Sequence, residues 1–219
     1  YFTSLKSFDE VPHAAELMRA HGVERKVLSR DELLAVEPAF RGFGERHIVG
    51  GTYTASDESG DARRFTQALA RHCARLGARM LFGRTVHGIE VAGGEVQAVH
   101  VSAGSGEDSA SNDVSLKADA VVVACGSYSA PLLRRVGVDL PIYPGKGYSA
   151  TFDILRPEAA PWISTIDDEM QCAMTRMGNQ LRVAGTIELA GFDTSLDTPL
   201  ARTRCEMLTR RVEQVLPGV

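Results

Sequence analysis

The stretch KADAVVVACGSYSAPLL, residues 117–133, decides the expected fold. Its centre, residues 120–124, is a continuous apolar run rich in β-branched valine and bounded by turn residues. Such a run is typical of a strand buried on both faces, as in a parallel sheet. Gly126 follows as a turn residue, and Pro131 suits the first turn of a short helix over 129–136. The sequence therefore predicts a strand–glycine–helix corner.

A corner of this kind is a place where a ligand can approach the chain. At the carboxyl end of a buried strand, a glycine such as Gly126 lets a ligand come close to the backbone. The helix that follows offers its N-terminus to an anion. The corner by itself favours a ligand only weakly, so the rest of the chain has to identify it.

The residues around this corner predict an α/β region over 62–139. Residues 62–76 carry apolar side chains at spacings of three and four, and Gly77 closes the expected helix. A strand is expected to start at residues 80–82. A hairpin is expected over 86–101, with its turn at two consecutive glycines. Residues 102–113 hold little that could pack, and we expect a mobile hairpin tip there.

The N-terminal 60 residues carry helix signals. Residues 11–21 predict a helix, and Ser29 with Glu32 has the form of a capping box at the start of a second one. This second helix should end before Pro38. Residues 47–54 predict a short strand that is broken by two glycines.

The C-terminal part has a different character. Strand-like pieces separated by turns predict an antiparallel meander, at residues 142–143, 148–154, 170–175 and 180–184. Residues 199–215 predict a last amphipathic helix. Antiparallel strands and an α/β region in one chain indicate two kinds of structural unit.

Composition excludes several classes of protein. The chain has 219 residues, 44% hydrophobic and 24% charged, with a net charge of -4. An acidic balance argues against nucleic-acid binding, and no apolar run approaches the roughly 20 residues that cross a bilayer. The four cysteines lack metal-ligand spacing, so we expect free, buried thiols and no metal site. The chain starts neither with methionine nor with a signal peptide, and we expect a piece of a longer product.

Several motifs together resemble a known family. They are GGTYTASDESGDARRFTQAL (50–69), FGRTVHGIEV (82–91), ACGSYSAPLL (124–133), YPGKGYS (143–149) and RVAGTIELAGFD (182–193). In this order they are similar to the D-amino-acid dehydrogenases, within the superfamily of D-amino-acid oxidase and glycine oxidase. The resemblance implies an incomplete FAD-binding Rossmann-like domain and an incomplete antiparallel substrate domain, an α+β (α/β) fold. The implied domains are 1–60 with substrate-domain helices, 61–139 for FAD and 140–219 for substrate.

The resemblance also implies an activity. Such enzymes oxidise D-amino acids to 2-oxo acids and ammonia with FAD, and they pass electrons to an acceptor such as a quinone. The implied location is cytoplasmic, at most peripheral to the inner membrane. A glycine oxidase-like or other flavin amine or 2-hydroxy-acid oxidoreductase is the alternative within the superfamily. A non-catalytic binding module is the alternative outside it.

Individual residues match family positions. Those implied to lie beside FAD are Gly51, Thr52, Val86, Ala124, Cys125, Gly126 and Tyr128. Those implied to lie near substrate are Tyr148, Cys172 and Ile187. Cys172 takes the place of a tyrosine that contacts the substrate carboxylate in glycine oxidases. A thiol cannot make that contact, so a buried structural thiol is the favoured interpretation. No catalytic residue is identified, because the flavin supplies the chemistry.

Two elements of the family pattern are not found in these residues. The family has a strand–GxGxxG–helix unit at its start and a GLRP-like arginine near its end. We therefore expect this chain alone to bind FAD weakly or not at all. We also expect unpaired strand edges that favour self-association.

Overall fold

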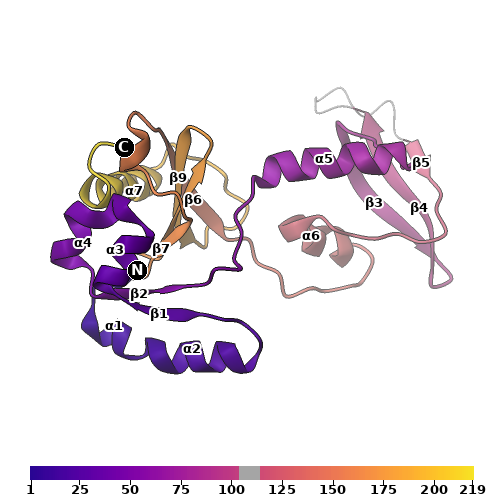
Figure 1. The fold of residues 1–219 in the computed structure, drawn as a ribbon. Coiled ribbons are helices and arrows are strands. Elements are labelled where there is room, and N and C mark those ends of the chain that lie inside the picture. Colours follow the sequence, from indigo (N-terminus) through magenta and orange to yellow (C-terminus); the bar gives the residue numbers. More distant parts are fainter. Residues whose placement is uncertain (104–113) are drawn as a thin grey trace. The chain divides into compact units, whose positions relative to one another are not determined.

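The computed structural model describes residues 1–103 and 114–219, so most of the expected hairpin tip over 102–113 lies outside the described residues. The chain divides into two compact units. The first unit joins Tyr1–Asp61 with Gly145–Val219, and the second is Ala62–Pro144 (Figure 1). Each unit is described separately below.

A four-stranded antiparallel sheet forms the centre of the first unit. Its strands are β6 (Lys146–Asp153), β7 (Thr165–Asp167), β8 (Cys172–Met177) and β9 (Gln180–Glu188), in the order β6-β9-β8-β7. The expected antiparallel sheet is confirmed, with two corrections. Residues 142–143 are not a strand, and β7 was not predicted because it is only three residues long. A short 3₁₀ helix, η4 (Pro157–Ala159), lies between β6 and β7.

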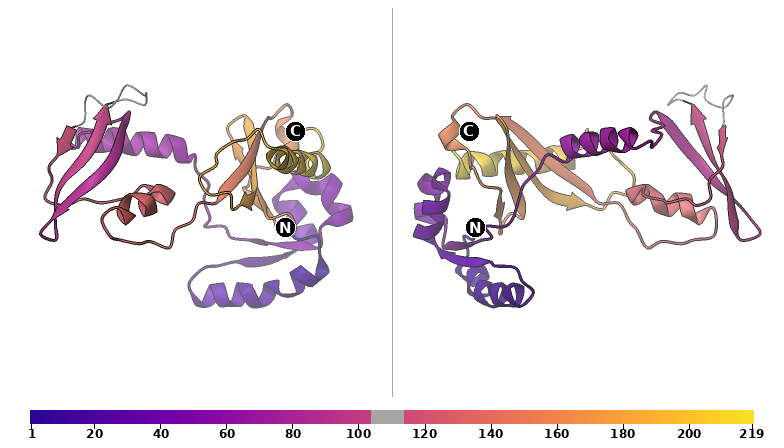
Figure 2. Two further views of the ribbon diagram at one scale, coloured as in Figure 1. Left: turned by 180° about the vertical axis from the view of Figure 1, so that it is seen from behind. Right: turned by 45° about the vertical axis from the view of Figure 1, so that its right-hand side comes forward.

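Helix α7 (Pro199–Val215) packs on this sheet and has the bounds that the sequence predicts. Its N-terminus is capped by Thr198, whose side chain accepts from the N–H of Ala201. Figures 1 and 2 show the helix lying against the strands in every view. The contact buries apolar side chains from both elements, namely Met174, Leu181, Val183, Leu208, Val212 and Val215. Burial of this apolar face is the main source of stability in the unit.

The N-terminal segment adds helices and a two-stranded sheet. Its elements are α1 (Leu5–Asp9), α2 (Val11–Ala20), β1 (Lys26–Ser29), α3 (Arg30–Val36), η1 (Pro38–Phe40), α4 (Arg41–His47) and β2 (Gly50–Tyr53). The capping box is confirmed, since Ser29 and Glu32 exchange side-chain-to-backbone hydrogen bonds at the start of α3. Helix α3 ends at Val36, two residues before Pro38.

Strand β2 is not broken by its glycines but begins with them. A Cβ atom on Gly50 would lie 2.3 Å from Phe8 Cζ, and one on Gly51 would lie 2.3 Å from Leu33 Cδ1. Two helices can therefore approach β2 because these positions have no side chain. Packing explains the glycine pair without a ligand.

The second unit holds a helix and a three-stranded sheet. Its elements are α5 (Ala62–Arg75), β3 (Arg84–Ala92), β4 (Glu95–Ala103), β5 (Val114–Leu116), η3 (Gly126–Tyr128) and α6 (Ser129–Arg134). The strands pair antiparallel in the order β3-β4-β5. The hairpin is confirmed, and its turn places Gly93 and Gly94 at positive φ.

Two predictions for this unit are wrong. Residues 120–124 do not form a strand, and Val122 is 89% exposed. A valine run becomes a buried strand only when neighbouring strands and covering helices are present, and none of the described strands pairs with it. Residues 80–82 are also not a strand, because β3 begins at Arg84. The five described strand pairings of the two larger sheets are thus antiparallel, and so is that of β1 with β2.

Candidate functional site

A cavity of about 860 Å³ lies within the first unit. Its walls come from α3, from the β1–β2 pair, and from β7 and β8 of the larger sheet. The loop over 57–60 and the loop over 162–164 complete the lining. The volume falls within the range of small-molecule sites in proteins.

The cavity combines apolar surface with hydroxyl groups. Its apolar lining includes the buried Leu28, Leu33 and Phe40 together with the exposed Trp162 and Ile166. Such a lining suits a ligand that carries some apolar surface.

The hydroxyl groups form a connected row. Ser59 Oγ donates to Ser164 Oγ at 2.5 Å, and Ser164 Oγ donates to Thr175 Oγ1 at 3.2 Å. The row joins the loop after β2 to strand β8. It supplies polar groups that can orient a ligand.

Charged groups of both signs line the cavity. Arg25 is half-buried and donates from Nε to Thr54 Oγ1 at 3.4 Å. Asp57, Glu58 and Asp168 add carboxylates to the lining. A cation and carboxylates in one cavity can bind a zwitterion, because each charge of the ligand meets the opposite sign.

Glu37 at the end of α3 holds one wall in place. Its side chain is buried, at 3% exposure. Its Oε2 accepts from the backbone N–H of Trp162 at 2.7 Å and from that of Ile163 at 3.0 Å. Its Oε1 accepts from the N–H of Ala39 at 3.3 Å. One carboxylate thus joins the α3–η1 junction to the loop over 162–164.

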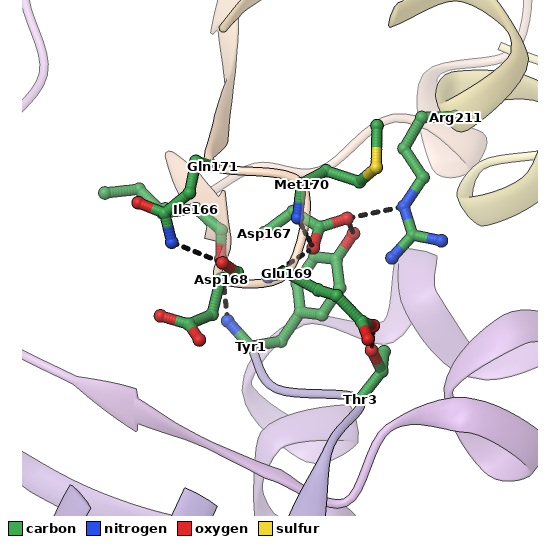
Figure 3. A network of polar contacts seen from close by, with 9 residues as sticks. All are labelled: Tyr1, Thr3, Ile166, Asp167, Asp168, Glu169, Met170, Gln171 and Arg211. Atoms are coloured by element: carbon green, nitrogen blue, oxygen red, sulfur yellow. Dashed lines mark hydrogen bonds and ion pairs between the residues drawn. The ribbon is translucent and has the colours of Figure 1, made fainter. Parts of the chain in front are cut away.

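A second buried carboxylate, Asp167, fixes the end of β7 (Figure 3). Its Oδ2 accepts from Tyr1 Oη at 2.6 Å and from Arg211 Nε at 2.5 Å. Its Oδ1 accepts from the N–H groups of Glu169 and Met170, each at 3.1 Å. The network ties the first residue and α7 to the turn between β7 and β8, which borders the cavity.

The network changes the titration of its members. Burial alone would raise the pKa of Asp167, but hydrogen bonds from Arg211 and Tyr1 outweigh burial and hold this pKa below its ordinary value. Burial, together with the hydrogen bond to Asp167, raises the pKa of the Tyr1 phenol well above its ordinary value. Asp167 is therefore a carboxylate and Tyr1 a neutral phenol near neutral pH.

The residues expected near substrate all lie in the first unit, and two of the three lie side by side. Tyr148 on β6 and Cys172 on β8 both pair with Gly185 on β9, so the sheet brings these two side chains into one row. Both are buried in the core that includes α7, and neither lines the cavity. Ile187 is 71% exposed. Of the residues expected beside FAD, Thr52 lines the cavity and Gly51 is buried under Leu33.

Tyr148 and Cys172 have structural partners. The Tyr148 hydroxyl donates to Glu188 Oε2, and this hydrogen bond raises the pKa of Tyr148 to about 12. Burial raises the pKa of the Cys172 thiol to about 11, helped by the nearby charge of Asp167. Cys172 is a neutral core thiol, as the buried-thiol interpretation holds. All four cysteines are free, but only Cys172 is fully buried and Cys125 is exposed.

The remaining residues expected beside FAD lie in the second unit. Val86 on β3 is 41% exposed and Tyr128 is 60% exposed. Ala124, Cys125 and Gly126 form an exposed turn that leads into η3 and α6. The N–H of Cys125 donates to Ser129 Oγ at 3.0 Å.

The turn fits close approach by a cofactor. Gly126 has φ +54°, and a Cβ atom there would meet nothing within 4 Å. The backbone conformation favours glycine, and the space beside the glycine is open. These residues could therefore hold a cofactor that lies over the backbone, whereas Gly51 is buried against Leu33.

Other kinds of site find no support in the part of the chain that the structure describes. Residues 1–103 and 114–219 contain no cluster of three or more histidine, cysteine, aspartate or glutamate side chains that could hold a metal ion. Over the same residues, no helix is long and apolar enough to cross a membrane.

Three residues of the cavity were not found from sequence. Arg25, Glu37 and Trp162 lie far apart along the chain and belong to no motif. The one available signal was an acidic residue directly before Pro38, at the end of a helix that is otherwise apolar there. Its partners could not be inferred, because they lie 125 and 126 residues away.

Comparison with known proteins identifies similar folds and the family of the chain. Glycine oxidase from Geobacillus kaustophilus superposes with a TM-score of 0.78 at 22% identity, over 99% of this chain and 53% of that chain. L-proline dehydrogenase from P. horikoshii superposes with a TM-score of 0.80 at 15% identity, over 99% and 55%. The sequence profile of the FAD dependent oxidoreductase family DAO matches residues 1–219. The chain belongs to this family.

Curated relatives give a finer comparison. A D-amino acid dehydrogenase of Dechloromonas aromatica is 43% identical over 217 residues, which is 99% of this chain and 49% of the relative. A D-amino acid dehydrogenase of Rhizobium rhizogenes is 37% identical over 217 residues, with the same shares. The chain thus spans about half the length of these relatives.

Proposed function

We propose that this chain is part of an FAD-dependent dehydrogenase that deaminates D-amino acids oxidatively. The observation that carries the proposal is the 43% identity to a D-amino acid dehydrogenase across 99% of the chain. Several further relatives of similar identity, from different bacteria, have the same activity in their names. A shared reaction is the simplest account of similarity at this level along the whole chain.

The cavity in the first unit suits an amino acid. Arg25 supplies a cation for a carboxylate, and Asp57, Glu58 and Asp168 supply carboxylates for an ammonium group. The hydroxyl row that includes Ser164 adds orienting hydrogen bonds. We include Thr52 in this site because it lines the cavity.

The second unit is proposed to hold the cofactor. When bound, FAD would supply the two-electron oxidation by which a D-amino acid and water give a 2-oxo acid and ammonia. The turn Ala124–Gly126 would lie under the cofactor, with Val86 and Tyr128 beside it. Residues 61–139 would then serve the cofactor, while residues 1–60 and 140–219 would serve the substrate.

Of the three residues expected near substrate, we propose a direct contact for Ile187 and an indirect role for Tyr148 and Cys172. Ile187 has the exposure that a contact with substrate requires. Tyr148 and Cys172 would act only by shaping the sheet, since both are buried. Gly51 likewise would place β2 rather than touch the flavin.

The partners follow from the reaction. Electrons would pass to an acceptor such as a quinone, at a cytoplasmic location that is at most peripheral to the inner membrane. Self-association would use residues 118–124, which pair with none of the described strands, and the apolar face of α5, where Phe65 and Leu69 are 69% and 48% exposed.

The test is substrate selectivity of the gene product that contains these residues. Reduction of a dye acceptor is measured with D-amino acids, with their L-enantiomers and with glycine. The proposal expects turnover with D-amino acids well above that with L-enantiomers or glycine. Turnover with glycine alone would favour the oxidase-like alternative, and absence of any turnover in a protein with bound FAD would favour a non-catalytic role.

A further inference from the structure

Trp162 forms part of the cavity wall, and its backbone is held by a hydrogen bond to a buried side chain. The indole is 71% exposed, and Arg176 Cζ lies 3.8 Å from the ring centroid. Pro161, directly before it, is fully buried. Trp162 is also the single tryptophan of the chain.

Glu37 is the group that fixes this backbone. The N–H groups of Trp162 and Ile163 both donate to the same carboxylate oxygen, at 2.7 and 3.0 Å. An N–H that donates to a charged acceptor makes a stronger hydrogen bond than one that donates to a neutral group. Without Glu37, two part-buried backbone donors would lose their partner, and the loop would move to find new ones.

We propose that Glu37 is a positioning residue that sets Trp162 as the specificity-determining wall of the cavity. The ligand selected by this wall is an amino acid with an apolar side chain, which can pack on the exposed indole. The second half of this statement rests on the proposed function, whereas the positioning by Glu37 does not depend on any ligand.

Positioning is tested on the 219-residue chain by the fluorescence of its single tryptophan. Glu37→Met keeps the length of the side chain but removes both acceptors, and Glu37→Gln keeps one acceptor oxygen. The matched control is Ser29→Ala, which weakens the start of the same helix α3 without touching the loop. Steady-state anisotropy, acrylamide quenching and the near-ultraviolet circular dichroism of the indole are compared at equal fractions folded.

The expected result is a graded loosening of Trp162. Glu37→Met should lower the anisotropy and weaken the near-ultraviolet circular dichroism of the indole, because orphaned donors release the loop. Glu37→Gln should lie between this variant and the parent, and Ser29→Ala should match the parent. The proposal is overturned if the Trp162 signals of Glu37→Gln and Glu37→Met match those of the parent. It is also overturned if Ser29→Ala changes these signals as much as the Glu37 variants do. If Glu37→Met does not fold, the comparison between Glu37→Gln and Ser29→Ala tests the positioning role of Glu37.

Selection of the ligand is tested separately in the gene product. Trp162→Ala should lower the ratio of kcat/KM for D-phenylalanine over that for D-alanine about tenfold, the effect of lost apolar contact in a pocket. An unchanged ratio in an active enzyme would overturn the role of Trp162 as the selecting wall. Absence of activity in the parent would instead contradict the proposed function. The fluorescence experiment would still test the positioning by Glu37, because it needs no ligand.

Discussion

Arg211 on α7 donates from Nε to Oδ2 of Asp167 at 2.5 Å, and this pair joins the C-terminal helix to the end of strand β7. The side chain of Asp167 is fully buried and that of Arg211 is 13% exposed (Figure 3). A buried pair of opposite charges costs little while both members are present, but loss of one member leaves the other charge uncompensated. The pair is therefore a sensitive point of the first unit.

Removing either member should destabilise the fold. Asp167→Asn or Arg211→Met should each lower the free energy of unfolding by about 3–5 kcal/mol. The neighbouring Arg210 offers a matched control, because its ion pair with Glu206 is exposed at the surface. Arg210→Ala should cost less than about 1 kcal/mol. Urea titration measures the free energy of unfolding of all three variants. Equal losses of this free energy for Arg210→Ala and Arg211→Met would contradict a larger contribution from the buried pair.

The same pair should make the free energy of unfolding depend on pH in the acid range. The pKa of Asp167 in the folded chain lies below its ordinary value of 3.8. A lowered folded pKa contributes stability that is complete above 3.8 and disappears as the pH falls through the folded value. The stability difference between the parent and Asp167→Asn should thus be constant near neutral pH and shrink in acid. Urea titrations at a series of pH values measure this difference, and a constant difference throughout would rule out the linkage.

The four thiols should differ in reactivity. The pKa of Cys172 is raised to about 11 by burial and by the charge of Asp167, so the reactive thiolate is scarce near neutral pH. Cys125 is exposed in the turn before η3. Alkylation followed by mass spectrometry should label Cys125 rapidly and Cys172 only after unfolding. Fast labelling of Cys172 in the folded chain would contradict its place in the core.

Two glycines in the second unit test the proposed cofactor turn. Gly126 and Gly137 both have positive φ, at +54° and +83°, and both have open space where a Cβ would lie. Alanine should therefore strain either backbone by a similar amount. If the cofactor lies over Gly126, Gly126→Ala should weaken FAD binding by the gene product about tenfold or more, a cost of about 1.4 kcal/mol, while Gly137→Ala should change it little. Equal effects in a fluorescence titration would remove Gly126 from the cofactor site.

Local signals in the sequence predicted much of the fold. The capping box of Ser29 and Glu32, the turn at Gly93 and Gly94 and the bounds of α7 all depend on residues within a few positions of one another. The periodicity of apolar residues added the antiparallel sheet of the first unit. Each of these features is fixed by near neighbours, so a single sequence is enough to find it.

Contacts between residues far apart in the chain could not be predicted from the sequence. The valine run over 120–124 met every local criterion for a buried strand, yet among the described residues it has no strand to pair with, and Val122 is exposed. The partners of two carboxylates lie far along the chain, up to 126 residues away for Glu37 and up to 166 residues away for Asp167. Such pairs are set by tertiary packing, which periodicity does not contain.

The candidate site was predicted only in part for the same reason. Thr52 was expected beside FAD, and the structure places it in the lining of the cavity. Tyr148 and Cys172 came from the family resemblance, but the sheet turns both toward α7, because alternate residues of a strand face opposite sides. The sequence located β6, β8 and β9 but did not determine which of their faces would be open.

The most direct test of the proposed activity is the flavin absorbance of the gene product under anaerobic conditions. Adding a D-amino acid should bleach the oxidised flavin band, because the α-hydrogen leaves with two electrons, and a dye acceptor should restore it. The L-enantiomer at the same concentration should leave the band unchanged. A protein that carries FAD but shows no bleaching with any D-amino acid would contradict the assignment.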